Sequence, residues 1–464
     1  MTPAEWLEIL VRRLDERWKT LGVYDAYYEG DQILSYATKK FRDVYGGLFT
    51  SLTDNWMPIV VDATAERLRV QGFRFGENTD ADKDAWAIWQ ANGLDAEANM
   101  LHTEAIKLSE AYWMVQPNGD VPRITAEHPS QVIVACAPGD RRTRLAALKK
   151  WQGEDGWIYA NVYLPDRIVK YKTKREPLSV LDLPDPKKPE WETIGASANP
   201  LGVVPIVPAP NNPSMIHGGR SDLAGGPTRI QDAINKLLAD MLVGSEYQAF
   251  PQRVLLGVEQ PKDAEGKPIP MSDIQKTSQG SRLWMFPSKE AKAFEFKAAD
   301  LKNFRESIDG LIRDLTAQTR TPPHYVSGQI VNASGDALKA AETGLVSKVR
   351  DKMDPFGEAH EEAMRLAFKS IGDEEKAAAL DAETIWKDPE SRTQAETVDA
   401  VTKEVAIGLP LEVAFQKIGY SPQEVDRIMM LREAEGLLTN FATNAEPQPE
   451  GATPNGPERT RPNL

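Results

Sequence analysis

This 464-residue chain has very little cysteine and no long apolar run. Cys136 is its single cysteine, which excludes an intrachain disulfide and any metal site built from several cysteines. No stretch approaches the roughly 18 apolar residues that suggest a membrane span, and the acidic, amphipathic N-terminus lacks a secretory-signal pattern. These absences predict a protein that is made, and stays, on the cytoplasmic side in a reducing compartment.

The chain also lacks the spacing of catalytic and metal-binding motifs. Its five histidines are scattered singly, and Met364 stands where a zinc-protease helix beginning at His360 would need its second histidine. The acids at residues 80–84 start like a calcium loop, but without its glycine and final glutamate. Gly266-Lys267 lacks the upstream glycine of a phosphate-binding loop. We therefore predict no catalytic site, no metal, no cofactor and no enzyme activity.

Composition indicates a soluble globular protein. Hydrophobic residues make up 41% and charged residues 27% of the chain, which is ordinary for this class, and the length suits roughly two to four domains. The net charge of −14 argues against tight, salt-dependent binding to DNA or to an anionic membrane. The basic cluster from Arg141 to Lys150 has two interpretations: a nucleic-acid contact, or a solvated hairpin beside an acidic neighbour. The second is favoured, because no aromatic residues interleave the cluster.

The first half of the chain is predicted to hold helices followed by strands. Apolar residues recur at helical spacing in residues 4–20, and further helices are predicted at about 58–70 and from 84 onward. Residues 121–174 read as short strands with turn residues between them, which predicts an antiparallel meander. Residues 182–213 are rich in proline and are predicted to be irregular or extended.

Two strongly periodic helices follow, separated by residues 252–297, which read as short strands around a polar loop. Two helices with a compact insertion between them can lie antiparallel, with the insertion at their far tip. The apolar stripes predicted to pack the two helices together are Ile230, Ile234, Leu237, Leu238 and Met241 in the first and Leu301, Phe304, Ile308, Leu311 and Leu315 in the second.

A nearly uncharged segment follows the second of these helices. From Thr316 to Gly335 the only formally charged residue is Arg320. Pro322-Pro323 should stiffen its start, whereas Gly328 and Gly335 permit changes of backbone angle. The segment is therefore predicted to be a long, supple loop between two helices. As a mere connector such a loop would need no function, because long surface loops are often only mobile.

The last third of the chain is predicted to be helical and acidic. Pro355 is expected to kink or divide the helix that starts near Gly335. Residues 373–435 contain 15 Asp and Glu against 7 Lys and Arg, a net charge of −8. The tail at 441–464 is expected to be disordered.

Several segments occur in a specific order along residues 20 to about 370. They are YDAYYEGDQ, NWMPIVVDATAERLRVQGF, AEHPSQVIVA, NPLGVVPIVPAPN, GRSDLAGGPTRIQDAINKLLADMLVGSEYQAFPQRVLLG, TPPHYVSG and NASGDALKAAETGL. In order and content they resemble the portal proteins of tailed bacteriophages, of the siphophage type found in phages of actinobacteria. The acidic helical end and the tail match that family only by position and character.

The resemblance implies an α+β portal fold with a wing, a stem, a clip and a crown. The wing would contain N-terminal helices and an antiparallel β-meander, the stem two helices, the clip a small β structure and the crown acidic α-helices. The implied boundaries are wing 1–222, stem helices 223–249 and 300–320, clip 250–299, tunnel loop 321–335, kinked wing helix 336–372, crown 373–440 and disordered tail 441–464.

The resemblance also implies a function and partners. About twelve copies would form a ring at one capsid vertex and conduct double-stranded DNA during packaging and ejection. The ring would bind DNA weakly and without sequence preference, and would contact terminase, then a head–tail adaptor, the major capsid protein and a scaffold, but no membrane. It would reside in the virion, and in the host cytoplasm during assembly.

The loop would project toward the DNA, and a basic band would face the lumen. The loop residues are Ser327, Gly328, Gln329, Ile330, Val331, Asn332, Ala333 and Ser334, and the band would consist of Lys339, Lys348 and Lys352. Duplex DNA carries one negative charge per roughly 1.7 Å of axis, so a wall rich in lysine and arginine would grip it. An acidic ring with an uncharged collar would instead let the duplex slide.

Two other functions remain open at this point. A glycan hydrolase could use the tryptophan-rich first half of the chain and a pair of carboxylates. Another head–tail connector ring component is the second alternative, although such chains are usually much shorter and need no pair of helices around an insertion.

Overall fold

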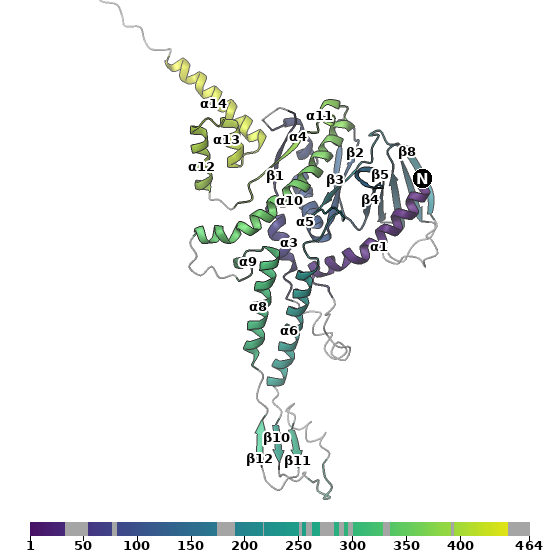
Figure 1. The fold of residues 1–464 in the computed structure, drawn as a ribbon, viewed down its shortest axis with the longest axis vertical. Helices are drawn as coiled ribbons and strands as arrows, with labels where there is room; N and C mark the ends of the chain where they lie inside the picture. Colours follow the sequence, from purple (N-terminus) through teal and green to yellow (C-terminus); the bar gives the residue numbers. More distant parts are fainter. Residues whose placement is uncertain are drawn as a thin grey trace, which may run out of the picture. The chain divides into compact units, whose positions relative to one another are not determined.

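In the computed structural model (Figure 1), helices and mainly antiparallel sheets make up a first unit, Met1–Ser391, and a helical unit, Arg392–Leu464, follows it along the chain. The residues that the structure describes are 1–32, 54–76, 81–173, 191–216, 218–249, 253–256, 262–269, 283–286, 292–295, 300–327, 335–390 and 394–443.

Helix α1 (Pro3–Glu29) covers one face of a five-stranded antiparallel sheet. Thr2 and Glu5 form a capping box at its start: the side chain of each residue accepts a hydrogen bond from the backbone N–H of the other. Its buried leucines, including Leu10, pack against sheet residues such as Leu148 and Val162. The strands, in sheet order, are β4 (Val132–Ala137), β5 (Asp140–Gln152), β6 (Ile158–Tyr163), β7 (Arg167–Thr173) and β8 (Trp191–Ala198).

The other face of this sheet packs on a three-stranded sheet, in which β2 (Glu110–Gln116) lies between β3 (Arg123–Glu127) and β9 (Ile206–Pro210). The two-residue period of β2 explains the layers. Tyr112 and Met114 are buried with residues of the five-stranded sheet, whereas Trp113 faces the helices on the opposite side.

The predicted meander is confirmed for β4 to β7 and corrected at its ends. β3, predicted to belong to the meander, pairs instead with β2. Within the segment predicted to be irregular or extended, β8 extends the five-stranded sheet and β9 pairs with β2.

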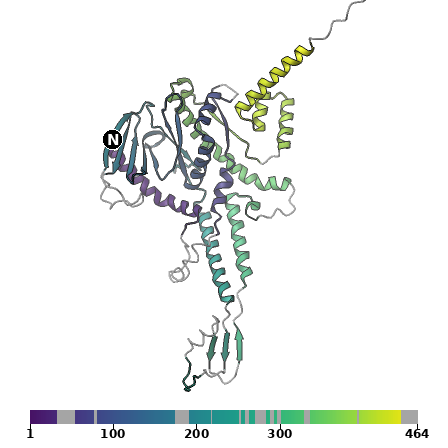
Figure 2. The ribbon, with the colours of Figure 1, turned by 180° about the vertical axis from the view of Figure 1, so that it is seen from behind.

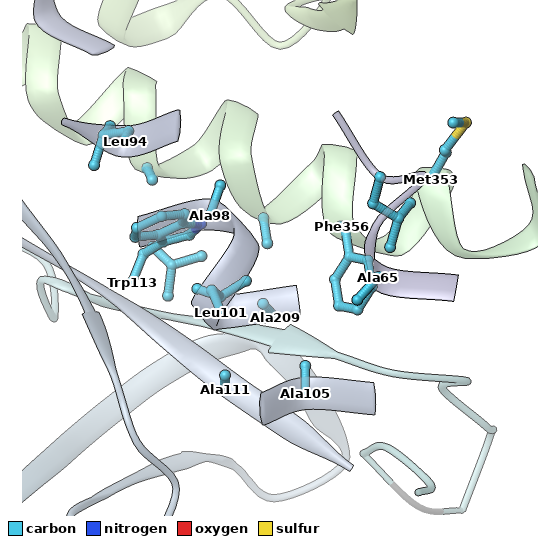
Figure 3. Packing of buried hydrophobic residues seen from close by; sticks show 14 of the residues in the cluster. Ala65, Leu94, Ala98, Leu101, Ala105, Ala111, Trp113, Ala209, Met353 and Phe356 are labelled. Carbon is cyan, nitrogen blue, oxygen red and sulfur yellow. The ribbon is translucent and has the colours of Figure 1, made fainter. Parts of the chain in front are cut away.

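A layer of helices completes the largest core. It contains α3 (Met57–Ala65), α4 (Lys83–Ala91), α5 (Leu94–Leu108) and α10 (Gly335–Ser370). Figure 3 shows Leu101 and Ala105 of α5 close to Ala111 of β2 and Ala209 of β9, with Phe356 of α10 beside them. These small and large apolar side chains fix α10 to the sheet.

Two histidines that lie 258 residues apart meet inside this core. His102 and His360 are fully buried, with their Nε2 atoms 2.9 Å apart, and Trp113 Nε1 donates to His360 Nδ1 at 2.9 Å. Because an indole N–H only donates, His360 must accept at Nδ1 and carry its own proton on Nε2. Burial lowers the pKa of His360 to about 3 and, together with the neighbouring imidazole, holds the pKa of His102 well below its usual value.

Helix α10 runs without a break through Pro355, so of the two outcomes predicted for this proline, a kink or a division, the division does not occur. Figures 1 and 2 show the helix changing direction along its length. A proline inside a helix removes one backbone hydrogen bond and crowds the preceding turn, which favours such a bend.

The helices α6 (Gly226–Ala249) and α8 (Leu301–Thr319) are separated along the chain by a small sheet. In it, β10 (Arg253–Leu256) pairs in parallel with β11 (Leu283–Phe286) and antiparallel with β12 (Lys292–Glu295). The three strands predicted in this region are therefore confirmed.

The C-terminal third departs from the predicted helical end at two places. Residues 373–440 are not helical throughout: α11 (Glu374–Ala378) is followed by β13 (Glu383–Trp386), which pairs with β1 (Val70–Arg74) in the first unit. The second unit contains α12 (Gln394–Ala406), α13 (Leu411–Ile418) and α14 (Pro422–Thr443). Since α14 reaches Thr443, the predicted tail is helical at its first three residues, and 444–464 lie outside the described residues.

Candidate nucleic-acid interface

The helices α6 and α8 pack against each other in opposite directions. Gly226, at the start of α6, lies beside Gln318 near the end of α8, and Gly244 near the end of α6 lies beside Leu301 at the start of α8. A Cβ built on Gly226 would lie 2.2 Å from the Gln318 Oε1 atom, so a larger residue at this position would displace the end of the Gln318 side chain. The two helices are thus antiparallel, as their sequence order predicts.

Most residues of the predicted apolar stripes lie together between the helices. Ile234, Ile308 and Ile312 form a buried cluster, against which Ile230, Leu237, Leu238 and Leu311 pack while remaining partly exposed. Leu315 belongs to the large core instead. Met241, Leu301 and Phe304 are half-buried.

Buried polar groups hold the first turns of α6 to the N-terminal part of the chain. The Gln231 side chain, fully buried, accepts from the Trp56 N–H at 2.9 Å and donates to the Asp54 carbonyl at 2.6 Å. The Tyr27 hydroxyl donates to Asp232 at 2.7 Å. In the sequence, Gln231 and Asp232 lie off the apolar stripe of this helix. The apolar period alone does not indicate that these polar side chains are buried.

The exposed face of α8 carries charges of both signs. Lys302 pairs with Glu306 at 3.5 Å and Arg305 with Asp309 at 3.2 Å, each one turn apart. Exposed pairs of this kind contribute little stability. They balance the charge, so this helix presents neither a strongly acidic nor a strongly basic surface.

A short helix, α9 (Pro323–Ser327), occupies the start of the predicted loop 321–335. Helix α8 ends at Thr319 and is capped by Arg320, whose φ of 57° lies in the left-handed region and whose N–H donates to the Thr316 carbonyl. The prediction that the whole segment is a loop is therefore wrong for 323–327, where proline starts a helical turn. Of the predicted DNA-facing residues, Ser327 ends α9, whereas Gly328, Gln329, Ile330, Val331, Asn332, Ala333 and Ser334 lie outside the described residues.

Residues before and after 328–334 contact Arg67, which follows α3. On the near side, Tyr325 of α9 accepts a hydrogen bond from Arg67 at 2.6 Å through its hydroxyl. On the far side, Glu342 of α10 pairs with Arg67 at 3.2 Å and with His324 at 3.5 Å. Residues on both sides of 328–334 are thus bound to the same arginine.

A buried charge cluster, which we call the Asp222 cluster, lies where the end of α8 meets α10. It consists of the buried side chains of Asp222, Lys352 and Asn211, the partly exposed Lys348 and the exposed Asn212. Lys348 and Lys352 each lie 2.8 Å from an Asp222 carboxylate oxygen, and Lys348 also donates to the Thr319 carbonyl at 3.2 Å. Lys352 donates to Asn211 and Asn212 as well.

A close backbone approach fixes the position of Asp222. The Asp222 N–H donates to the Ile106 carbonyl at 3.0 Å, and the Ser221 hydroxyl donates to the Lys107 carbonyl at 2.5 Å. A Cβ on Gly219 would come within 2.0 Å of the Ser109 carbonyl oxygen, so only glycine fits there.

Burial and the neighbouring charges set the ionisation of this cluster. Although burial alone would raise it, the two lysines hold the pKa of Asp222 below its ordinary value. Burial, reinforced by Lys348, lowers the pKa of Lys352 to about 8, with Asp222 acting in the opposite direction. At neutral pH the cluster therefore contains one carboxylate between two ammonium groups.

Lys339, Lys348 and Lys352 were predicted to form a basic band facing the lumen. This prediction is wrong for Lys352, which is buried. The Lys352 side chain is 1% exposed, and that of Lys348 is 13% exposed and paired with Asp222. Their charges are compensated inside the protein and are not presented as a free basic surface. Lys339 is exposed.

The basic cluster near the β4–β5 turn pairs with acidic residues. Arg144 pairs with Glu362, Lys149 lies 2.7 Å from Glu127, and Lys150 lies 2.5 Å from Asp15. The acidic neighbours agree with the interpretation favoured from the sequence, but the hairpin is not solvated throughout, because the side chains of Arg144 and Lys150 are only 10% and 7% exposed.

Sequence reasoning missed Asp222 and Arg67 as organising residues. Both act through partners more than 100 residues away, and neither lies in a motif that marks such contacts. In the ranges that the structure describes, no group of three or more His, Cys, Asp or Glu is placed to hold a metal ion. Nor does any helix among these residues have the length and apolar character to cross a membrane.

Two curated proteins share about a third of their residues with this chain. It is 30% identical to the portal protein of Mycobacterium phage L5 over 433 residues, covering 88% of this chain and 85% of that protein. It is 31% identical to the portal protein of Mycobacterium phage D29 over 404 residues, covering 82% and 79% respectively.

Solved structures give more distant likenesses. One is a chain from the neck of an empty GTA particle computed with C6 symmetry, with a TM-score of 0.44, 13% identity and coverage of 76% of this chain and 88% of that chain. Another, from the neck of a native GTA particle computed with C12 symmetry, has a TM-score of 0.42, 11% identity and coverage of 84% and 95%.

The sequence profile of a protein family matches nearly the whole chain. The family is described as phage portal protein, SPP1 Gp6-like, and its match covers residues 7–428. This match and the two mycobacteriophage relatives agree. The chain belongs to the phage portal protein family.

Proposed function

We propose that copies of this chain close into a ring of about twelve subunits that conducts double-stranded DNA through one capsid vertex during packaging and ejection. The observation that carries the proposal is the portal-family match over residues 7–428. The antiparallel pair of α6 and α8, with a small sheet inserted between them along the chain, supports it.

The proposal assigns parts of the chain to parts of the ring. Residues 1–222 and 336–372 form the wing, α6 and α8 the stem, residues 250–299 the clip, and the second unit the main part of the crown. The loop at 321–335 lines the bore. This last assignment is supported by the anchoring of both loop flanks and by the lack of charge between Arg320 and Gly335.

The charge pattern suits a channel that does not hold DNA. Strong binding to duplex DNA comes from lysines and arginines that displace counterions from phosphates. Here Lys348 and Lys352 are paired with Asp222, the exposed charges of α8 balance, and the chain as a whole carries −14. A duplex in such a bore meets no deep energy minimum and can slide.

The proposal extends to partners. The ring docks terminase during packaging and a head–tail adaptor afterwards, with the major capsid protein and a scaffold around the wing. It acts in the virion after assembly in the host cytoplasm, and the energy of packaging comes from the terminase motor.

A loop variant tests the DNA-channel role. Gln329→Lys combined with Asn332→Lys adds two positive charges per subunit, which should grip phosphates and slow packaging severalfold while rings still assemble. The measurement is DNA packaged per unit time in an assay with terminase and proheads containing the variant ring. Gln329→Ser with Asn332→Ser is the matched uncharged control. Packaging at the wild-type rate by the lysine variant would remove this loop from the DNA path.

A further inference from the structure

A single buried arginine contacts three separate parts of the chain around the loop. Arg67 follows α3 and its side chain is 9% exposed. One guanidinium nitrogen, Nη2, donates to the Tyr325 hydroxyl at 2.6 Å and lies 3.2 Å from Glu342, while Nη1 donates to the Pro389 carbonyl at 2.9 Å. Arg67 therefore connects α9, α10 and the stretch that follows β13.

The first two partners lie on opposite sides of the loop. Tyr325 precedes residues 328–334 and Glu342 follows them, yet both contact the same guanidinium group. His324 strengthens the link, because its Nε2 lies 3.5 Å from the Glu342 carboxylate. One side chain thus contacts both α9, which precedes residues 328–334, and α10, which follows them.

The third partner lies in residues 387–390, which we call the strap. The strap is the last described stretch of the first unit, and beyond it the chain continues into the second unit. The Lys387 N–H donates to the Arg69 carbonyl at 2.8 Å, and Arg350 of α10 pairs with Glu390 at 2.9 Å. The strap is therefore held by the segment around Arg67 and by α10, the helix that leads out of the loop.

Arginine suits this position better than lysine. Its guanidinium is planar, always charged and offers five N–H donors in a fixed fork, so it can serve several partners in set directions. A lysine ammonium is a point charge on a flexible stem and could not reproduce this arrangement. Low exposure strengthens each of these charge-assisted hydrogen bonds.

We propose that Arg67 is a positioning residue for the two helices on either side of residues 328–334: it contacts α9 and α10 at once and couples their position to the strap. A displacement of α9 or of the start of α10 then reaches the strap. This inference rests on the proposed function, because only a loop in the DNA path is displaced by DNA.

The test is hydrogen–deuterium exchange on the assembled full-length protein, comparing backbone amides of residues 324–327, 336–345 and 387–390. Tyr325→Phe removes one hydroxyl and touches only α9 directly. Coupling through Arg67 predicts that exchange rises roughly threefold to tenfold in α9 and also rises measurably in the other two segments. A purely local contact predicts a rise in residues 324–327 alone, and that result overturns the proposal.

Arg67→Met and a matched control complete the design. Arg67→Met keeps the aliphatic stem and should raise exchange in all three segments by roughly tenfold or more, since it removes every bond at once. Arg74→Met removes the same charge from an exposed pair with Glu383, whose side chains are 40% and 68% exposed, and should leave the three segments unchanged. An Arg67→Met ring with unaltered exchange at the strap also overturns the coupling. If Arg67→Met does not assemble, Tyr325→Phe alone decides.

The exchange experiment tests the coupling through Arg67, and the packaging experiment tests the DNA-channel role. Either hypothesis can therefore fail without the other. Exchange is measured without DNA, so coupling can hold even if the lysine variant of the loop packages normally, in which case only the proposed function fails. If the lysine variant packages slowly but exchange changes only locally, the channel role stands and the role of Arg67 is refuted.

Discussion

The protein buries titratable side chains in two contrasting ways. In the large core, His102 and His360 are fully buried, and Trp113 fixes the proton arrangement of His360. In the Asp222 cluster, one carboxylate and one ammonium group are buried, and a second, partly exposed ammonium group lies beside them. The first arrangement avoids the penalty of burying charge by keeping both rings neutral, whereas the second offsets that penalty by pairing.

The difference corresponds to position in the fold. The imidazole pair lies between elements that apolar packing already holds together, such as β2 and α10. The Asp222 cluster instead joins the segment after β9 to α10 and to the carbonyl at the end of α8. Charges with directional hydrogen bonds specify a geometry that a small apolar contact would leave loose. We therefore expect the cluster to set the angle between the helix pair and the rest of the first unit.

Removing the carboxylate from the Asp222 cluster should have the largest effect. Asp222→Asn leaves Lys352 buried without its counter-charge, which costs about 3–5 kcal/mol when one partner of a buried pair is lost. The measurement is the midpoint of urea unfolding compared with wild type. Asp351→Asn, which breaks an exposed pair with Arg320, is the control and should change the midpoint little. Equal effects of the two variants would contradict the role given to the cluster.

Acidification should weaken the large core by an intermediate amount. The folded pKa of His360, about 3, lies below its unfolded value near 6.5, so the unfolded chain binds more protons below that pH. Stability from this group is complete above pH 6.5 and falls as pH drops toward 3, by up to about 1.4 kcal/mol per pH unit. The burial of His102 acts in the same direction.

A variant isolates this contribution. His360→Gln can still accept from Trp113 and donate to His102, but does not titrate. The difference in unfolding free energy between pH 7 and pH 5 should be smaller in this variant than in wild type. An unchanged pH dependence would show that the imidazole pair does not govern acid stability.

Replacing both partners of a pair should have the smallest effect. Asp222→Asn combined with Lys352→Met removes the carboxylate together with the buried ammonium, leaving only Lys348, which is more exposed. Because removing both charges avoids an unpaired one, the double variant should recover most of the loss of Asp222→Asn alone. Additive destabilisation of the two substitutions would contradict a direct pair. Urea unfolding of the single and double variants gives the coupling energy.

Periodic apolar residues made much of the fold predictable. The stripes of α6 and α8 and the alternating strands β4 to β7 depend on local patterns that the sequence carries openly. Even the antiparallel arrangement of the two helices follows from their order around the insertion.

Contacts between distant segments could not be predicted in this way. The His102–His360 pair and the ties of Arg67 to Tyr325 and Glu342 join residues hundreds of positions apart, and no local spacing encodes them. For the same reason Lys352, which reads as a surface lysine on an amphipathic helix, is in fact buried. The strand β13 was predicted to be helical because its pairing with β1 is likewise remote.

The most direct test of the central claim is the position of residues 321–335 in an assembled ring, determined by electron cryomicroscopy of the purified protein. Our account predicts that many copies close around an axis and that the α8 end, α9 and the start of α10 face the bore. A ring that carries Tyr325 and Glu342 on its outer rim, away from the axis, would contradict it.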